Sequence, residues 1–149
     1  MTGVRLIRVS TRRTGVRETV RVLVYDELAE MRAAAARFTG NDPGEWAGVM
    51  GVCQTYKVEG VVDGDWVTKR QPLIVRLWRG ALGSRVVTHE MSHAATELYG
   101  RTVDPEAPVG EHLHNANEVL AHLHSDITYK LVDLLYAYGY YDREMVMSA

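Results

Sequence analysis

The sequence has almost no cysteine, no long apolar run and little net charge. Cys53 is the only cysteine, which excludes a scaffold held together by disulfides. No apolar run approaches the roughly 18–20 residues that cross a bilayer, and the first residues lack the apolar core of a secretory signal. The formal net charge of −2 argues against a dedicated nucleic-acid-binding protein. We therefore expect a cytoplasmic protein with neither a membrane nor a nucleic-acid partner.

The chain has the length and composition of one globular domain. Its 149 residues are 46% hydrophobic and 24% charged, which is enough apolar material for a single core. No internal repeat, low-complexity tract or linker divides the sequence. Residues 1–149 are therefore expected to form one domain, and nothing in the sequence indicates an oligomeric state.

Alternation of apolar and polar residues predicts several strands in the first half of the chain. Turns are expected at Arg12–Gly15 and at Asp63-Gly64, which is a hairpin signal. The last two strands lie on either side of the break that Pro72 introduces. The expected strands are Val4–Val9, Thr19–Tyr25, Val49–Gly60, Trp66–Lys69 and Leu73–Trp78.

Three helices are predicted from capping residues and helical spacing of apolar side chains. Asp26 and Ser84 are expected to cap the first two, and glycines at positions 40, 100 and 139 to end the three. The expected helices are Asp26–Phe38, Ser84–Tyr99 and about His112–Tyr138. The sequence thus predicts an α+β fold, with a small mixed or antiparallel sheet and two long helices in the second half.

The distribution of histidine points to a functional site. All six histidines fall between residues 89 and 124, and the first 88 residues have none. Histidine is the most common metal ligand and the usual proton carrier near neutral pH. The six are His89, His93, His112, His114, His122 and His124.

The clearest motif is the segment His89-Glu90-Met91-Ser92-His93, inside the second predicted helix. Its spacing puts both imidazoles on one helix face with Cβ atoms about 6 Å apart, a span that one zinc ion bridges with bonds of roughly 2.0–2.1 Å. Glu90 follows about 100° around the helix, where it can take a proton from a metal-bound water. The alternative is two surface histidines beside an incidental glutamate.

A catalytic zinc site needs a third protein ligand. The metzincin arrangement would need glycine at position 96 and histidine at position 99, where this chain has Thr96 and Tyr99. Glu118 is the favoured candidate, because two antiparallel helices can place it opposite the histidine pair. It shares one helix face with His122 and Asp126 and could instead form an ion pair with His114 or His122. The other candidate ligands are Asp104, His112, His114 and His122.

With these residues the sequence resembles the zincin metallopeptidases, in particular the gluzincin branch. That branch combines H-E-x-x-H with a glutamate on a following helix, often after an asparagine, here His89, Glu90, His93 and Asn117-Glu118. The resemblance covers about residues 73–126. It implies a zincin-like fold with an active-site helix and a second long helix that bears a ligand, a Zn²⁺ cofactor on His89, His93 and Glu118, and a peptide or protein substrate.

The resemblance also implies roles that several residues could fill. The branch commonly has an acidic residue four positions after the glutamate, where this chain has His122, so the residue that supports a histidine ligand could be Asp126 or another. The substrate would pair with an edge strand, either Leu73–Trp78 or Gln54–Gly60. The candidate donors to the oxyanion are Tyr99, His112, His114, Tyr129 and Tyr136.

The expected function is hydrolysis of peptide bonds by a metal-activated water, with Glu90 as the general base. The alternative is a zincin-like metal-binding module that regulates or binds a partner without efficient turnover. A third reading, an interaction domain with incidental histidines, predicts no bound metal.

Overall fold

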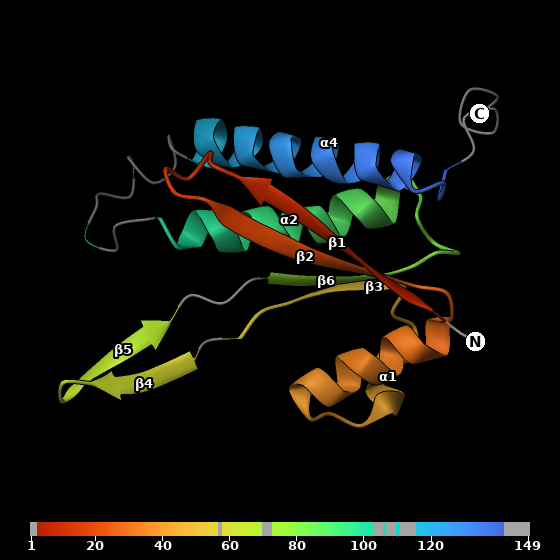
Figure 1. The fold of residues 1–149 in the computed structure, drawn as a ribbon, viewed down its shortest axis with the longest axis horizontal. Helices are drawn as coiled ribbons and strands as arrows, with labels where there is room; N and C mark the ends of the chain where they lie inside the picture. Colours follow the sequence, from red (N-terminus) through yellow and green to blue (C-terminus); the bar gives the residue numbers. More distant parts are fainter. Residues whose placement is uncertain are drawn as a thin grey trace.

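The computed structural model describes residues 3–56, 58–69, 73–102, 106, 110 and 116–141. Within these residues the fold is a mixed α+β arrangement (Figure 1). Its strands are β1 (Val4–Thr11), β2 (Glu18–Tyr25), β3 (Gly51–Gln54), β4 (Val58–Val62), β5 (Asp65–Lys69) and β6 (Leu73–Trp78). Its helical segments are α1 (Leu28–Thr39), the 3₁₀ turn η1 (Pro43–Trp46), α2 (Ser84–Gly100), the π-helical turn η2 (Ala116–Leu120) and α4 (Ala121–Ala137).

Four strands form a mixed sheet in the order β1-β2-β6-β3. β2 and β6 run parallel, while β1 and β3 pair antiparallel with their neighbours. β6 therefore lies inside the sheet, and Leu73–Trp78 is not an edge strand. The other segment considered for substrate pairing, Gln54–Gly60, shares only Gln54 with the edge strand β3 and otherwise overlaps β4 of the separate hairpin, so the edge strand beside the sheet is β3 itself.

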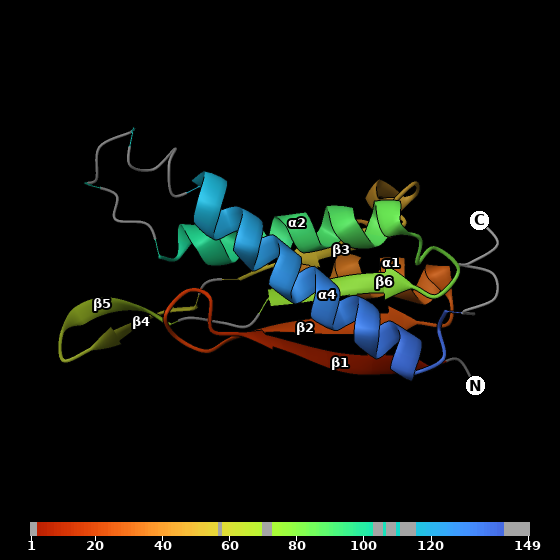
Figure 2. The same cartoon turned by 90° about the horizontal axis from the view of Figure 1, so that it is seen from above.

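Helices cover both faces of this sheet. In Figure 1 and Figure 2, α2 and α4 lie side by side on one face and α1 lies on the other. The main core forms between α2, α4 and alternate residues of the strands, such as Val20, Val22 and Val24 of β2. α1 buries Met31, Ala35 and Ala36 on its own side of the sheet. In the described part of the chain, no helix combines the length and apolarity needed to cross a membrane.

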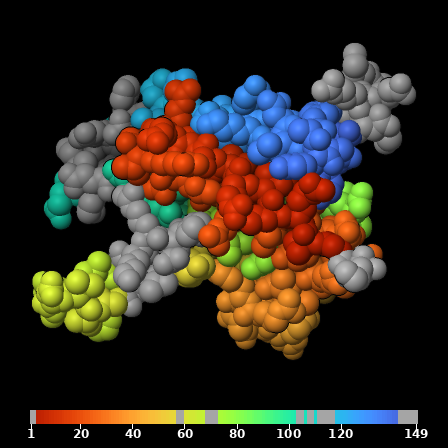
Figure 3. All heavy atoms as spheres, in the orientation of Figure 1, coloured from red at the N-terminus to blue at the C-terminus, as the bar shows by residue number. Residues whose placement is uncertain are grey.

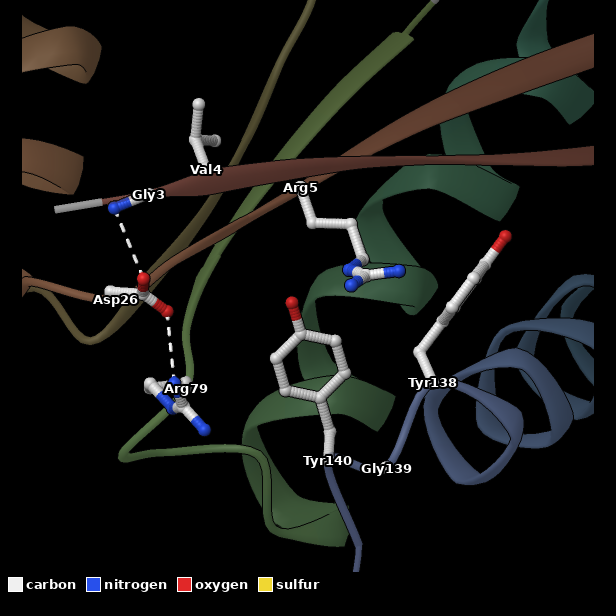
Figure 4. Close-up of a pocket in the computed structure, with 8 residues that line it drawn as sticks. All are labelled: Gly3, Val4, Arg5, Asp26, Arg79, Tyr138, Gly139 and Tyr140. Carbon is white, nitrogen blue, oxygen red and sulfur yellow. Dashed lines mark hydrogen bonds and ion pairs between the residues drawn. The ribbon is translucent and has the colours of Figure 1, made fainter. Parts of the chain in front are cut away.

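Asp26 and Ser84 do not cap helices as the sequence predicts. The Asp26 carboxylate accepts a hydrogen bond from the Gly3 amide and pairs with Arg79, each at 3.0 Å (Figure 4). Glu27 and Gly83 occupy the two N-cap positions instead, and neither position has a side-chain cap. Both predictions were wrong because a local capping signal does not reveal competing long-range partners or a one-residue shift in helix start. The predicted stop after α1 is confirmed, since Gly40 ends the helix with φ 74°.

The C-terminal end of α4 is attached to the sheet by aromatic contacts. Figure 4 shows Arg5 of β1 beside Tyr138 and Tyr140, and its guanidinium carbon lies 4.5 Å from the centre of the Tyr138 ring. Tyr141 donates a hydrogen bond of 2.6 Å to the carbonyl of Leu82. The tyrosines after α4 therefore stabilise the end of the helix through packing.

The segment predicted as one strand from Val49 to Gly60 is divided between two sheets. β3 ends at Gln54, and β4 pairs with β5 in a separate two-stranded sheet. The predicted hairpin turn is confirmed, because Asp63 and Gly64 both have positive φ, at 52° and 85°. Figure 1 and Figure 2 show this hairpin projecting beyond the end of the four-stranded sheet, and Figure 3 shows its atoms as a separate lobe.

Candidate metal-binding and catalytic site

Helix α2 presents one face to the core and the other to a pocket. Its buried apolar positions, among them Val87, Met91, Ala94 and Leu98, recur at helical spacing and pack against the sheet and α4. This pattern leaves His89 and His93 on the outer side of the helix, while Met91 of the same motif belongs to the core. The packing of the core therefore fixes the orientation of the motif.

The side chains of His89 and His93 converge. Their Nε2 atoms are 3.2 Å apart, and the two rings are nearly perpendicular, with an interplanar angle of 84°. Two nitrogens bound to one tetrahedral zinc ion with bonds of roughly 2.05 Å would be about 3.3 Å apart. The pair thus fits two neighbouring ligand positions of a zinc ion, and the exposed edges of both rings leave room for the ion.

The pocket beside this pair has a volume of about 440 Å³ and lies between α2, β3 and η1. Gly51 allows β3 to approach α2 closely. A Cβ atom at Gly51 would lie 3.0 Å from Val86 Cγ1 and 3.2 Å from Glu90 Cγ. The lining residues are Trp46, Val49, Gly51, Val52, Cys53, Thr55, Leu73, His89, Glu90, His93, Thr96 and Glu97.

Glu90 is held between the helix and the edge strand. Its side chain is only 6% exposed, and the backbone amide of Cys53 donates a hydrogen bond to the carboxylate. Burial raises the pKa of this carboxyl, while the nearby His89 and His93 and the amide bond act in the opposite direction. A carboxylate with a raised pKa suits a general base that works near neutral pH.

Cys53 lies in the pocket wall, and its thiol ionises less readily than that of a free cysteine. Burial, together with the carboxylates of Glu90 and Glu97, raises its pKa to about 12. At pH 8 the thiolate fraction should be on the order of 10³ times lower than that of a free cysteine, whose pKa is about 8.5. Alkylation by iodoacetamide in the folded, chelator-treated protein should therefore be slow and should accelerate about tenfold per pH unit.

This prediction is simple to read because Cys53 is the only thiol in the chain. The same protein unfolded in guanidinium chloride is the control and should react at the rate of free cysteine. Equal rates in the folded and unfolded protein at pH 8 would contradict the raised pKa of Cys53.

Glu118 lies on η2, which packs against α2. Its carboxylate is 68% exposed and lies 3.8 Å from Nε2 of His122, so the structure shows the ion-pair alternative. Within the described residues, no third histidine, cysteine, aspartate or glutamate forms a metal-holding group with His89 and His93. Of the predicted site residues, the structure therefore brings together His89, Glu90 and His93, and it does not bring Glu118 into that group.

The carboxylate of Asp126 is bonded to residues of β1 and α4. Its Oδ2 atom accepts hydrogen bonds from Thr11 at 2.7 Å and from Lys130 at 2.9 Å. Burial raises the pKa of this carboxyl, but those two hydrogen bonds and the charges of Lys130 and Arg13 outweigh burial and hold the pKa below its usual range. Asp126 thus links α4 to β1, and its observed partners do not include a ligand histidine.

The remaining candidates divide between two groups. Asp104, His112 and His114 lie outside the described residues. Tyr129 is exposed and bonded to Asp133, Tyr136 contacts Tyr141 in a tilted arrangement, and Tyr99 packs against the core. None of these three tyrosines is among the described residues that line the pocket.

His124 and Trp46 form contacts that the sequence did not predict. His124 Nε2 lies 3.3 Å from the carbonyl oxygen of Thr88, directly before the motif, and so links α4 to α2. Trp46 lines the pocket from η1, and its buried indole N–H has no hydrogen-bond partner in the described part of the chain. No local sequence signal distinguishes this tryptophan from a core residue.

Comparison with models of protein families, with curated proteins and with solved structures found no match to this chain. Its function is therefore inferred from its own residues and their geometry.

Proposed function

We propose that the protein is a zinc-dependent peptidase that hydrolyses peptide bonds with a water molecule activated at the His89–His93 pair. The observation that carries this proposal is the 3.2 Å separation of the two Nε2 atoms in a pocket that also contains the buried Glu90 carboxylate. Two surface histidines with an incidental glutamate would also account for the contact between the rings, but not for the burial of the Glu90 carboxylate against the Cys53 amide.

In this proposal, different parts of the pocket have different roles in the hydrolysis. A bound zinc ion would supply a Lewis acid that polarises the scissile carbonyl and lowers the pKa of water. Glu90, oriented by the amide of Cys53, would accept the proton of the attacking water and donate it to the leaving nitrogen. β3 would pair with the backbone of the substrate through its free edge.

Glu118 remains our proposed third ligand. η2 already packs against α2, and the exposed Glu118 side chain is free of the core and can change rotamer. A π-helical turn is rare and is frequent at functional sites, which agrees with a ligand on this segment. In the ligand arrangement, the carboxylate would leave His122 and complete the coordination of the two histidines.

Elemental analysis of protein purified without a histidine tag tests the metal centre. We expect one zinc per chain in the wild type and almost none in His93→Ala. Glu118→Ala should weaken zinc binding by more than about 100-fold, since even residues that only support a ligand are worth roughly 10–100-fold. His124→Ala is the matched control and should keep its zinc, because that imidazole is bonded to the Thr88 carbonyl.

Each of the other outcomes has a distinct meaning. Zinc retained in Glu118→Ala would move the third ligand to a histidine or to Asp104. A wild-type protein that binds no zinc even when zinc is offered would overturn the peptidase proposal. Zinc without cleavage of any peptide in a library would favour the metal-binding regulatory or interaction module.

A further inference from the structure

The β4–β5 hairpin carries apolar side chains that are exposed to solvent instead of being buried in the core. Trp66 is 76% exposed, and Val61 lies directly opposite it in the register at 59% exposed. Val62 and Val67 are exposed on the other face of the hairpin. A two-stranded hairpin alone is marginally stable in water, and tryptophan is one of the residues enriched at binding hot spots. This composition is typical of a surface that binds a partner.

The hairpin begins and ends at the wall of the pocket. The chain leaves β3 through Thr55, forms the hairpin, and returns at Leu73, the first residue of β6. Both Thr55 and Leu73 line the pocket that contains the histidine pair. A polypeptide bound along the free edge of β3 would therefore meet the hairpin where it leaves the pocket.

The lengths of β3 and of the hairpin strands determine how long a ligand must be to contact both. β3 has four residues, which at about 3.3 Å each can pair with roughly 13 Å of an extended chain. β4 and β5 have five residues each and extend the surface by roughly 17 Å. Only a ligand longer than about five residues can contact both β3 and the hairpin.

We propose that the β4–β5 hairpin is a substrate-binding arm that takes the part of an extended, apolar polypeptide lying beyond the pocket. This inference rests on the peptidase function proposed above. The outer edges of β4 and β5 can pair with the backbone of the ligand, while the Val61–Trp66 pair contacts its apolar side chains. Asp63 and Asp65 make the turn end of the hairpin acidic and disfavour an acidic ligand there, whereas Lys69 lies at the other end of the hairpin. The substrate class is therefore an unfolded protein or a long apolar peptide.

The test distinguishes substrate binding by the hairpin from peptide cleavage in the pocket. Cleavage of a permanently unfolded protein, reduced and carboxymethylated α-lactalbumin, is compared with cleavage of a five-residue quenched peptide. Trp66→Ser should raise KM for the unfolded protein about tenfold and leave kcat/KM for the short peptide within about twofold. Tyr129→Ser, which removes an aromatic residue of α4 that is also largely exposed, is the matched control and should change neither.

A binding measurement decides the question even if turnover is absent. The Kd of the labelled unfolded protein for Glu90→Gln should weaken about tenfold when Trp66→Ser is added. Unchanged Kd and KM in the Trp66→Ser proteins would overturn the arm, while failure of the wild type to cleave either substrate would overturn the peptidase function alone. A dimer that disappears in Trp66→Ser would assign the hairpin to self-association and would also overturn the arm.

Discussion

Glu90→Gln is expected to lower kcat by roughly 10²–10⁴-fold, the usual contribution of a general base, without unfolding the protein. Glutamine keeps the size of the side chain and can still accept the hydrogen bond from the Cys53 amide. It cannot accept a proton from water, so the chemical step fails while the pocket keeps its shape. Steady-state cleavage of a short peptide, measured beside the circular dichroism spectrum and the zinc content, checks this expectation.

Two comparisons make the result specific. Glu27→Gln is the control, because Glu27 is exposed at the start of α1, on the opposite face of the sheet from α2. It should retain wild-type activity. Full activity in Glu90→Gln, or loss of activity together with loss of zinc, would contradict the assigned role of this carboxylate.

Gln54→Leu is expected to destabilise the fold by about 3 kcal/mol, because it removes one of the two hydrogen-bond partners of the buried Arg76 guanidinium and leaves only the bond of 2.6 Å to the Tyr25 hydroxyl. Arg76 is only 7% exposed, and its Nε donates a hydrogen bond of 2.7 Å to Oε1 of Gln54. Gln54 in turn donates to the carbonyl of Ala35 in α1 at 3.0 Å. The substitution removes both bonds from the interior. The midpoint of thermal unfolding should fall by roughly 6–12 °C for a chain of this length.

The double variant separates the lost bond from altered packing. In Gln54→Leu/Arg76→Met both polar partners are gone, so no guanidinium remains buried beside an apolar side chain. We expect the double variant to be more stable than Gln54→Leu alone, with a coupling energy of about 1.5–3 kcal/mol in urea unfolding. Strictly additive losses would show that the Arg76–Gln54 bond is not the source of the effect.

Local patterns in the sequence were sufficient for most of the secondary structure. Strands β1, β2 and β6, the turn at Asp63-Gly64 and the stop at Gly40 were predicted from period-two alternation and from glycine conformation. The convergence of His89 and His93 was also predicted, because i, i+4 spacing on a helix fixes it without reference to the rest of the fold.

Features that depend on partners distant in the sequence could not be predicted. Asp26 bonds to Gly3 and Arg79 instead of capping a helix, and Asp126 bonds to Thr11 across more than a hundred residues. The strand order, which puts β6 inside the sheet and β3 at its edge, is also a long-range property. Trp46 was missed because nothing in its local sequence indicates that it lines the pocket. The role of Glu118 as a metal ligand stays a prediction, since the structure places its carboxylate beside His122 and not beside the histidine pair.

The two faces of α2 have a thermodynamic consequence. The inner face of this helix belongs to the core, so the free energy that orders the backbone of the motif comes from apolar burial and not from a ligand. The backbone part of the entropy of fixing His89 and His93 side by side is thus already lost when the chain folds. In the proposed metal site, an ion that arrives later would meet two preorganised ligands, and only the third would still have to be immobilised. In this respect the protein differs from small zinc domains, in which the ion and the fold form together.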